Sequence, residues 1–163
     1  MLRILASCVV LVASLVACTT TASTAAPVSD VQHNSDMYLI DQIEANWHQA
    51  ASTKNVDLMM SLWADNATFT IGTKTYTGKA EIRDFITKAA PFKPENHWVS
   101  ETPAYKIKTT VSGDTGTLYF ECHYVDVATG KIAIVVGANQ DVARIGGKWL
   151  ITKSIAATPE LAP

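Results

Sequence analysis

Two neighbouring segments of the chain carry side chains that could move a proton. In the first segment, alternation along a predicted strand places Tyr119, Glu121 and His123 on one face. In the second segment, Asn139 and Asp141 share a face in the same way. If both faces line one cavity, His123 with Asp141 or Glu121 can form an acid–base pair, because histidine changes its charge near neutral pH.

The opposite orientation of the first strand is the alternative, and we favour it. Its other face is more apolar and carries Leu118, Phe120, Cys122 and Tyr124. Because the more apolar face of a strand is usually the buried one, the polar face is expected to be convex and solvated. The Cys122 thiol is then expected to be buried and inert rather than nucleophilic.

The other histidines and the known short motifs predict little chemistry. His97 precedes a predicted strand, where a surface or capping role is the better interpretation. His48 lies one turn after Glu44 and is interpreted as its solvated i,i+4 partner, and His33 falls in a predicted disordered spacer. Neither HxH nor HExxH spacing occurs, and no phosphate loop, serine elbow or CxxC motif is present. We therefore predict no metal site and no cofactor.

Several large side chains are candidates for a ligand pocket. Aromatic residues on the inward faces of predicted elements are typical of a core, although some of them can also line a cavity. The candidate pocket residues are Trp47, Trp63, Phe69, Phe85, Tyr119 and Asn139.

Three helices are expected to position these residues. The first is predicted from Asp36, with Ser35 or Asp36 as its N-cap, because apolar residues then recur every three or four positions. Its apolar stripe is Met37, Ile40, Ile43, Trp47, Ala50 and Ala51, with Asp41, Glu44 and His48 on the other side. A second helix follows its cap Asn55, and a third opens at Gly78 and stops before Pro91.

Strands make up the rest of the predicted domain. Two short ones are predicted at 67–71 and 73–77, and four longer ones at 105–111, 117–127, 131–144 and 148–156. Helices followed by consecutive antiparallel strands predict an α+β domain over residues 36–157, with a tail at 158–163. The chain carries 13 basic and 15 acidic residues, and its basic residues are scattered, which argues against nucleic acid as a partner.

The N-terminal segment predicts export and lipidation. Residues 1–17 begin with a positive charge and continue as an apolar run shorter than the roughly 20 residues of a membrane-spanning helix, so a signal peptide is favoured. The run ends in Leu15-Val16-Ala17-Cys18, which resembles a bacterial lipobox with Cys18 as the lipidated residue. Residues 18–35 then form a predicted flexible spacer rich in Thr, Ala and Ser. Contact with the membrane is expected through the lipid alone, on the outer membrane facing the periplasm if the cell is Gram-negative.

Three separated motifs resemble a known family. They are NVDLMMSLWADNATF from Asn55, YTGKAEIRDF from Tyr76 and GGKWLI from Gly146. In this order they are similar to the SnoaL-like branch of the nuclear transport factor 2-like superfamily. The resemblance implies a strongly curved antiparallel sheet wrapped against the helices as a cone-shaped α+β barrel. It also implies that the domain can form homodimers through the open face of the sheet.

The same resemblance argues against one activity. Matching the segment Ala64-Asp65-Asn66-Ala67 to the motif of ketosteroid isomerases places Ile71 where those enzymes carry their general base. Isoleucine cannot accept a proton, so enolisation of that kind is not expected.

The function expected from sequence is binding. We favour an envelope lipoprotein that binds a small hydrophobic ligand or a protein partner without catalysis. Two alternatives stay open. One is a cofactor-independent lyase or isomerase that uses His123 with Asp141 or Glu121, and the other is a homodimeric interaction module.

Overall fold

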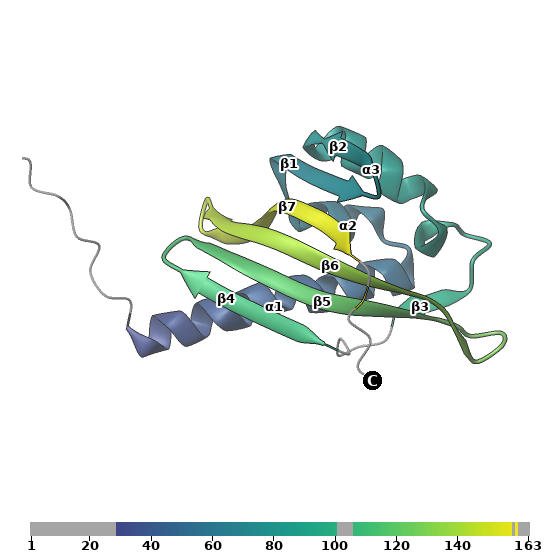
Figure 1. Cartoon of the computed structure of the whole chain (residues 1–163), viewed down its shortest axis with the longest axis horizontal. Coiled ribbons are helices and arrows are strands. Elements are labelled where there is room, and N and C mark those ends of the chain that lie inside the picture. Colours follow the sequence, from purple (N-terminus) through teal and green to yellow (C-terminus); the bar gives the residue numbers. More distant parts are fainter. Residues whose placement is uncertain (1–28, 101–105, 158, 160–163) are drawn as a thin grey trace, which may run out of the picture.

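A computed structural model describes residues 29–100, 106–157 and 159 (Figure 1). The predicted signal peptide, Cys18 and most of the predicted tail therefore lie outside the described residues. The helices are α1 (Asp30–Thr53), α2 (Val56–Ser61), α3 (Gly78–Lys88) and the short 3-10 turn η1 (Ala90–Phe92). The strands are β1 (Trp63–Ile71), β2 (Lys74–Thr77), β3 (Trp98–Ser100), β4 (Ile107–Ser112), β5 (Thr115–Asp126), β6 (Lys131–Ile145) and β7 (Lys148–Ala157). Within these ranges no helix combines the length and apolarity needed to cross a membrane.

The strands form one mixed, curved sheet that packs on the helices, as the α+β prediction requires. Its order is β2-β1-β7-β6-β5-β3, and β4 pairs with β5 on the same side as β3. One pairing differs from the antiparallel prediction, because β1 lies parallel to β7. Local alternation cannot reveal this pairing, since the two strands stand at opposite ends of the domain sequence. The β5–β6 pairing shifts register after Tyr124 and the β6–β7 pairing shifts after Asp141, and such irregularities bend a sheet.

Helix α1 begins earlier than the sequence predicted. Its N-cap is Ser29, whose side-chain oxygen accepts a hydrogen bond from the Gln32 backbone N–H at 3.2 Å. The predicted caps Ser35 and Asp36 lie inside the helix, so residues 30–35 are helical rather than spacer. The error has a physical cause. The first two turns are largely exposed and polar, so they lack the apolar residues at every third or fourth position from which a helix is predicted.

The core lies between the helices and one face of the sheet, which we call the inner face. In Figure 1, α1 runs behind the strands, and the opposite, outer face is turned to the viewer. The apolar side chains of β5 predicted to be buried do face α1, and they are Leu118, Phe120, Cys122 and Tyr124. The predicted stripe of α1 packs against them, with Trp47 edge-on to Phe120 at 5.7 Å between ring centroids. Gly116 lets the layers approach, since a Cβ there would collide with the Thr110 carbonyl and crowd Ile40.

Candidate functional site

The predicted polar row of β5 lies on the outer face. Tyr119, Glu121 and His123 point away from the helices, which is the orientation favoured from the sequence. Asn139 stands opposite Tyr119, so these two share the outer face as expected. Asp141 stands opposite Thr117, about 20 Å along the strand from His123. His123 and Asp141 therefore do not form the acid–base pair considered above.

Glu121 departs from the expectation that this row is solvated. Its exposed fraction is 0%, although it points outward. The Tyr119 hydroxyl donates a hydrogen bond to Glu121 Oε1 at 2.7 Å. His123 Nε2 lies 3.7 Å from Oε2, and Lys106 Nζ lies 3.9 Å from Oε1. Glu121 and His123 thus come together at ion-pair distance, in a setting where Tyr119 and Lys106 already bind the carboxylate.

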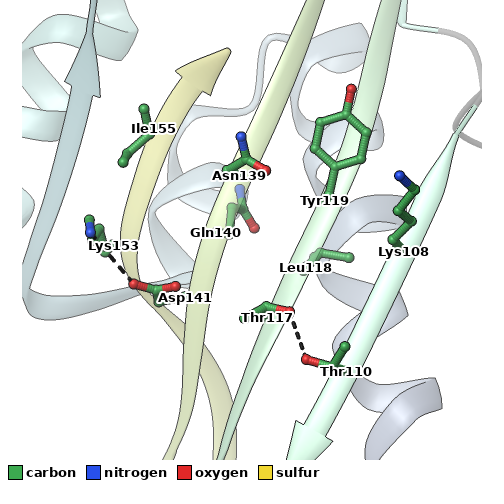
Figure 2. A pocket seen from close by; sticks show the side chains of 10 residues that line it. All are labelled: Lys108, Thr110, Thr117, Leu118, Tyr119, Asn139, Gln140, Asp141, Lys153 and Ile155. Carbon is green, nitrogen blue, oxygen red and sulfur yellow. Dashed lines mark hydrogen bonds and ion pairs between the residues drawn. The ribbon is translucent and has the colours of Figure 1, made fainter. Parts of the chain in front are cut away.

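A surface groove of about 390 Å³ crosses the outer face over β4, β5, β6 and β7 (Figure 2). Tyr119, Asn139 and Ile155 line it near one end. At the other end Asp141 pairs with Lys153 at 3.9 Å, and the hydroxyls of Thr110 and Thr117 lie 2.7 Å apart. The groove brings together two of the six predicted pocket residues, Tyr119 and Asn139.

The other four predicted pocket residues lie on the inner side and form a chain of aromatic contacts. The ring centroids of Trp47 and Trp63 are 5.8 Å apart, those of Trp63 and Phe69 5.6 Å, and those of Phe69 and Phe85 5.4 Å. The sheet separates this cluster from Tyr119 and Asn139. One pocket lined by all six residues is therefore wrong, because a strand sends alternate side chains to opposite faces.

Glu44 and His48 are buried rather than solvated. His48 has an exposed fraction of 0% and Glu44 one of 6%. His48 Nδ1 lies 2.9 Å from Glu44 Oε1, an ion-pair contact in which the ring N–H is poorly aligned for a hydrogen bond. On its other side, His48 Nε2 lies 3.2 Å from Cys122 Sγ. The structure thus brings a carboxylate, an imidazole and a thiol into successive contact between α1 and β5.

This buried group could have been found in the sequence. Residues at positions 40, 43, 44, 47, 48 and 51 follow the spacing of one wide helix face, so Glu44 and His48 stand within the apolar stripe of α1. Assigning them to the polar side relied on residue type instead of position. Their contact with Cys122 is a different matter, because it joins residues 74 positions apart.

The thiol of Cys122 is surrounded by polar groups. Burial raises the pKa of the Cys122 thiol far above its usual range, and the nearby polar side chains of Tyr124, Ser100 and Trp47 act in the opposite direction. Two of these groups, Trp47 Nε1 and Ser100 Oγ, are buried and meet no hydrogen-bond partner among the described residues. The thiol is therefore protonated at neutral pH, and unused donors lie close to it.

A second set of unpartnered polar atoms lies further along the inner face. Gln140 and Ser154 are cross-strand neighbours on β6 and β7, and both are buried. Within the described ranges, neither their side-chain atoms nor Trp63 Nε1 has a hydrogen-bond partner. Phe69 stands beside Ser154 on β1, so the aromatic cluster adjoins these atoms. Buried polar atoms are nearly always paired with protein, water or ligand, so a bound molecule is expected to contact these atoms.

The remaining sequence candidates lie away from this interior. Ile71 ends β1 opposite Lys74, with an exposed fraction of 38%. His97 is exposed, as predicted, and its carbonyl accepts a hydrogen bond from the Val127 N–H. His33 is exposed on α1, where the sequence had placed it in a spacer. In the part of the chain that the structure describes, no group of three or more His, Cys, Asp or Glu side chains is arranged to hold a metal ion.

Solved structures with the same fold come from several bacteria. A nuclear transport factor 2-like protein from Novosphingobium aromaticivorans matches with a TM-score of 0.69 and 17% identity, over 81% of this chain and 87% of its own. A nuclear transport factor 2-like protein from Pseudomonas putida matches with a TM-score of 0.68 and 15% identity, over 80% and 98%. A candidate dehydratase from Streptomyces avermitilis matches with a TM-score of 0.62 and 17% identity, over 79% and 99%. At these identities the likeness establishes the fold alone.

Family membership is shown by the sequence over most of the domain. No curated protein matches the chain. A family model for the SnoaL-like domain matches residues 32–155, from the first turns of α1 to the end of β7. That match, with the helices packed on a curved seven-stranded sheet, means that the chain belongs to the family of SnoaL-like domains.

Proposed function

We propose that this protein is a lipid-anchored envelope protein that binds a small hydrophobic molecule, without catalysis, between its helices and the inner face of its sheet. The observation that carries the proposal is the set of buried polar atoms without partners on Trp47, Trp63, Gln140 and Ser154. A buried polar atom left unpaired costs about 1–3 kcal/mol. Several such atoms beside one aromatic cluster are best explained by a bound molecule that satisfies them.

The chemistry of these atoms indicates what the molecule carries. Both indole nitrogens donate only, the Gln140 amide offers two donor hydrogens and one acceptor, and the Ser154 hydroxyl does either. Donors therefore outnumber acceptors, which favours a ligand with a carbonyl or carboxyl oxygen. The surrounding rings of Trp47, Trp63 and Phe69 favour an apolar body for the same ligand.

Several observations weigh against turnover. The position of the isomerase base is held by Ile71, which is partly exposed at the end of β1. His123 and Glu121 lie on the outer face, and Asp141 is distant from both.

The substitution Gln140→Leu tests the proposal. Leucine has a similar volume and removes the unpaired amide, so we expect the free energy of unfolding of the ligand-free protein to rise by about 1–3 kcal/mol. The same variant is expected to lose the thermal shift produced by a small hydrophobic ketone such as cyclohexanone. Chemical denaturation and thermal melting measure the two effects.

The matched control is Gln49→Leu on α1. Gln49 is exposed, and its carbonyl, which the substitution keeps, accepts the Thr53 hydroxyl. Its stability is expected to change by no more than about 0.5 kcal/mol, and cyclohexanone should still shift its melting temperature. If Gln140→Leu instead destabilises the protein, the amide is paired in solution and the interior needs no ligand.

Homodimerisation through the outer face is a second candidate, favoured by the groove, which none of the described helices covers (Figure 1). Ile155 lies in it with an exposed fraction of 39%, beside Asn139 and between side chains of both charges, which allows two copies to pair. We expect the protein to be a dimer by light scattering and Ile155→Arg to weaken the dimer by about 100-fold. Ile145→Arg, at an exposed turn on β6, is the control and should leave the dimer intact. A wild-type monomer at high concentration would rule this candidate out.

The proposed anchor makes its own prediction. Cys18→Ala is expected to abolish incorporation of a labelled fatty acid and to move the protein from the membrane fraction to the soluble fraction, because Cys18 is the residue that would carry the lipid. Cys8→Ala, which changes the other cysteine of the N-terminal segment, should keep both label and location. Labelling that persists in Cys18→Ala would contradict the lipobox.

A further inference from the structure

The proposed binding function makes no use of three buried side chains that contact one another in turn, Glu44, His48 and Cys122. His48 Nδ1 lies 2.9 Å from Glu44 Oε1, and His48 Nε2 lies 3.2 Å from Cys122 Sγ. An activated nucleophile has the same arrangement, in which a base contacts the nucleophile and a third group orients the base. The imidazole can accept the thiol proton at Nε2 while the carboxylate faces Nδ1.

Additional polar atoms surround the sulfur. Trp47 Nε1 and Ser100 Oγ are buried and lack partners among the residues described, and Ser100 stands opposite Tyr124 in the β3–β5 pairing. The residues around the sulfur, Trp47, Ser100, Glu44 and Tyr124, each keep an exposed fraction of 5–7%. The thiol thus lies just beneath the surface, and an indole N–H is free to bind an oxygen that carries developing charge.

We propose that Cys122 adds to small hydrophobic α,β-unsaturated carbonyl compounds, with His48 as the general base and Glu44 as the residue that positions it. This inference rests on the proposed function, because the compound must first enter the interior.

The reaction class follows from what the site holds. Transfer of an acyl group to the thiol would release a leaving group from the substrate and would then need water to free the thiol. Addition of the thiol to a C=C bond releases nothing and needs only that the thiol proton is returned to the substrate. As the S–C bond forms at the β carbon, the thiol proton passes to His48 Nε2 and the C=C electrons move to the carbonyl oxygen. Trp47 Nε1–H stabilises this enolate, and the imidazolium then returns the proton to the α carbon. The product is a thioether, with no oxidant or reductant consumed.

The protonated state of the buried thiol fits this scheme. Burial raises the pKa of the Cys122 thiol, so the resting site holds a protonated thiol and not a thiolate. The sulfur becomes nucleophilic only while His48 removes its proton. Charged thiol reagents in water should therefore react slowly, whereas small apolar electrophiles should react quickly.

The test uses the full chain in mild detergent with Cys8→Ser and Cys18→Ser, which leaves Cys122 as the single thiol. The protein is treated with 2-cyclohexen-1-one and followed by intact mass spectrometry. We expect one adduct on Cys122, formed about 100-fold faster than in the same protein carrying His48→Phe. A native protein that stays unmodified, while the unfolded protein is modified, would overturn the inference.

A second variant covers the case in which His48→Phe does not fold. Glu44→Gln keeps the size of the side chain and removes the charge beside His48 Nδ1. We expect its addition rate to fall about tenfold and the pH dependence of that rate to shift, because the imidazole has lost the charge that supports it. If both variants fold and react as fast as the wild-type site, His48 is not the base and the inference is wrong.

The saturated ketone cyclohexanone separates this inference from the proposed function. If cyclohexanone raises the melting temperature but 2-cyclohexen-1-one forms no adduct, binding stands and the addition is excluded. If neither compound acts, both proposals fail.

Discussion

We expect Asp36→Ala to lower the free energy of unfolding by about 3–5 kcal/mol, the range for removing one member of a buried ion pair. Asp36 has an exposed fraction of 2% and lies 2.6 Å from Arg144 Nη2. Its carboxylate also accepts hydrogen bonds from Gln32 Nε2 at 3.0 Å and from Trp149 Nε1 at 3.3 Å. Without it, the Trp149 N–H loses its partner, and the Arg144 guanidinium keeps only Asp114, whose Oδ1 lies 2.9 Å from Nε. Chemical denaturation measures the loss.

Asp84→Ala is the matched control for this prediction. Asp84 also forms an ion pair, with Lys88, but both side chains are exposed. An exposed pair contributes about 0–1 kcal/mol, so the control should be nearly neutral. Equal losses in the two variants would mean that the Asp36–Arg144 contact does not join α1 to β6 and β7 in solution.

The same carboxylate predicts a pH dependence. Hydrogen bonding from Arg144 lowers the pKa of Asp36, although burial acts in the opposite direction. Because the folded pKa lies below the unfolded value of about 3.9, the stabilisation is present above that pH and is lost as the pH falls through the folded pKa. The stability difference between wild type and Asp36→Ala should therefore shrink below about pH 4.

Asp36 also illustrates what the sequence could and could not predict. The period of the apolar residues correctly predicted the helices α1, α2 and α3, although not where α1 begins, and it predicted the strand alternation and the inward face of β5. It placed Asp36 at the start of α1 and His48 in water, because a pattern of residue types treats every charged side chain as exposed. Arg144 and Cys122, the partners that allow these residues to be buried, lie far away in sequence. Polar groups buried by distant partners are thus the part of the site that periodicity misses.

The sequence predicted correctly which residues lie on the outer face. Tyr119 and Asn139 share that face because alternation alone fixes it, and the pairing of β5 with β6 brings them level. The distance between His123 and Asp141 depends instead on the register of the two strands, which alternation leaves open. Which residues share a face could be predicted, whereas which residues meet could not.

The second large effect is expected from Trp63→Ala, which should destabilise the protein by about 3–5 kcal/mol. Trp63 is fully buried at the start of β1, where it pairs with Ile151 of β7. Its ring lies between those of Trp47 and Phe69, so its removal leaves a cavity bordered by α1 and the sheet. Trp98→Ala is the control, because Trp98 is only half-buried and should cost clearly less.

A second variant at position 63 separates packing from ligand binding. Trp63→Phe keeps most of the ring and removes Nε1, which has no partner among the described residues. If that N–H serves the bound molecule, losing it removes an unpaired donor from the ligand-free protein, and the cost should stay well below that of Trp63→Ala. The same change should weaken cyclohexanone binding by about tenfold, the effect of one hydrogen bond. Trp63→Phe that is as unstable as Trp63→Ala would show that the indole N–H is paired inside the empty protein.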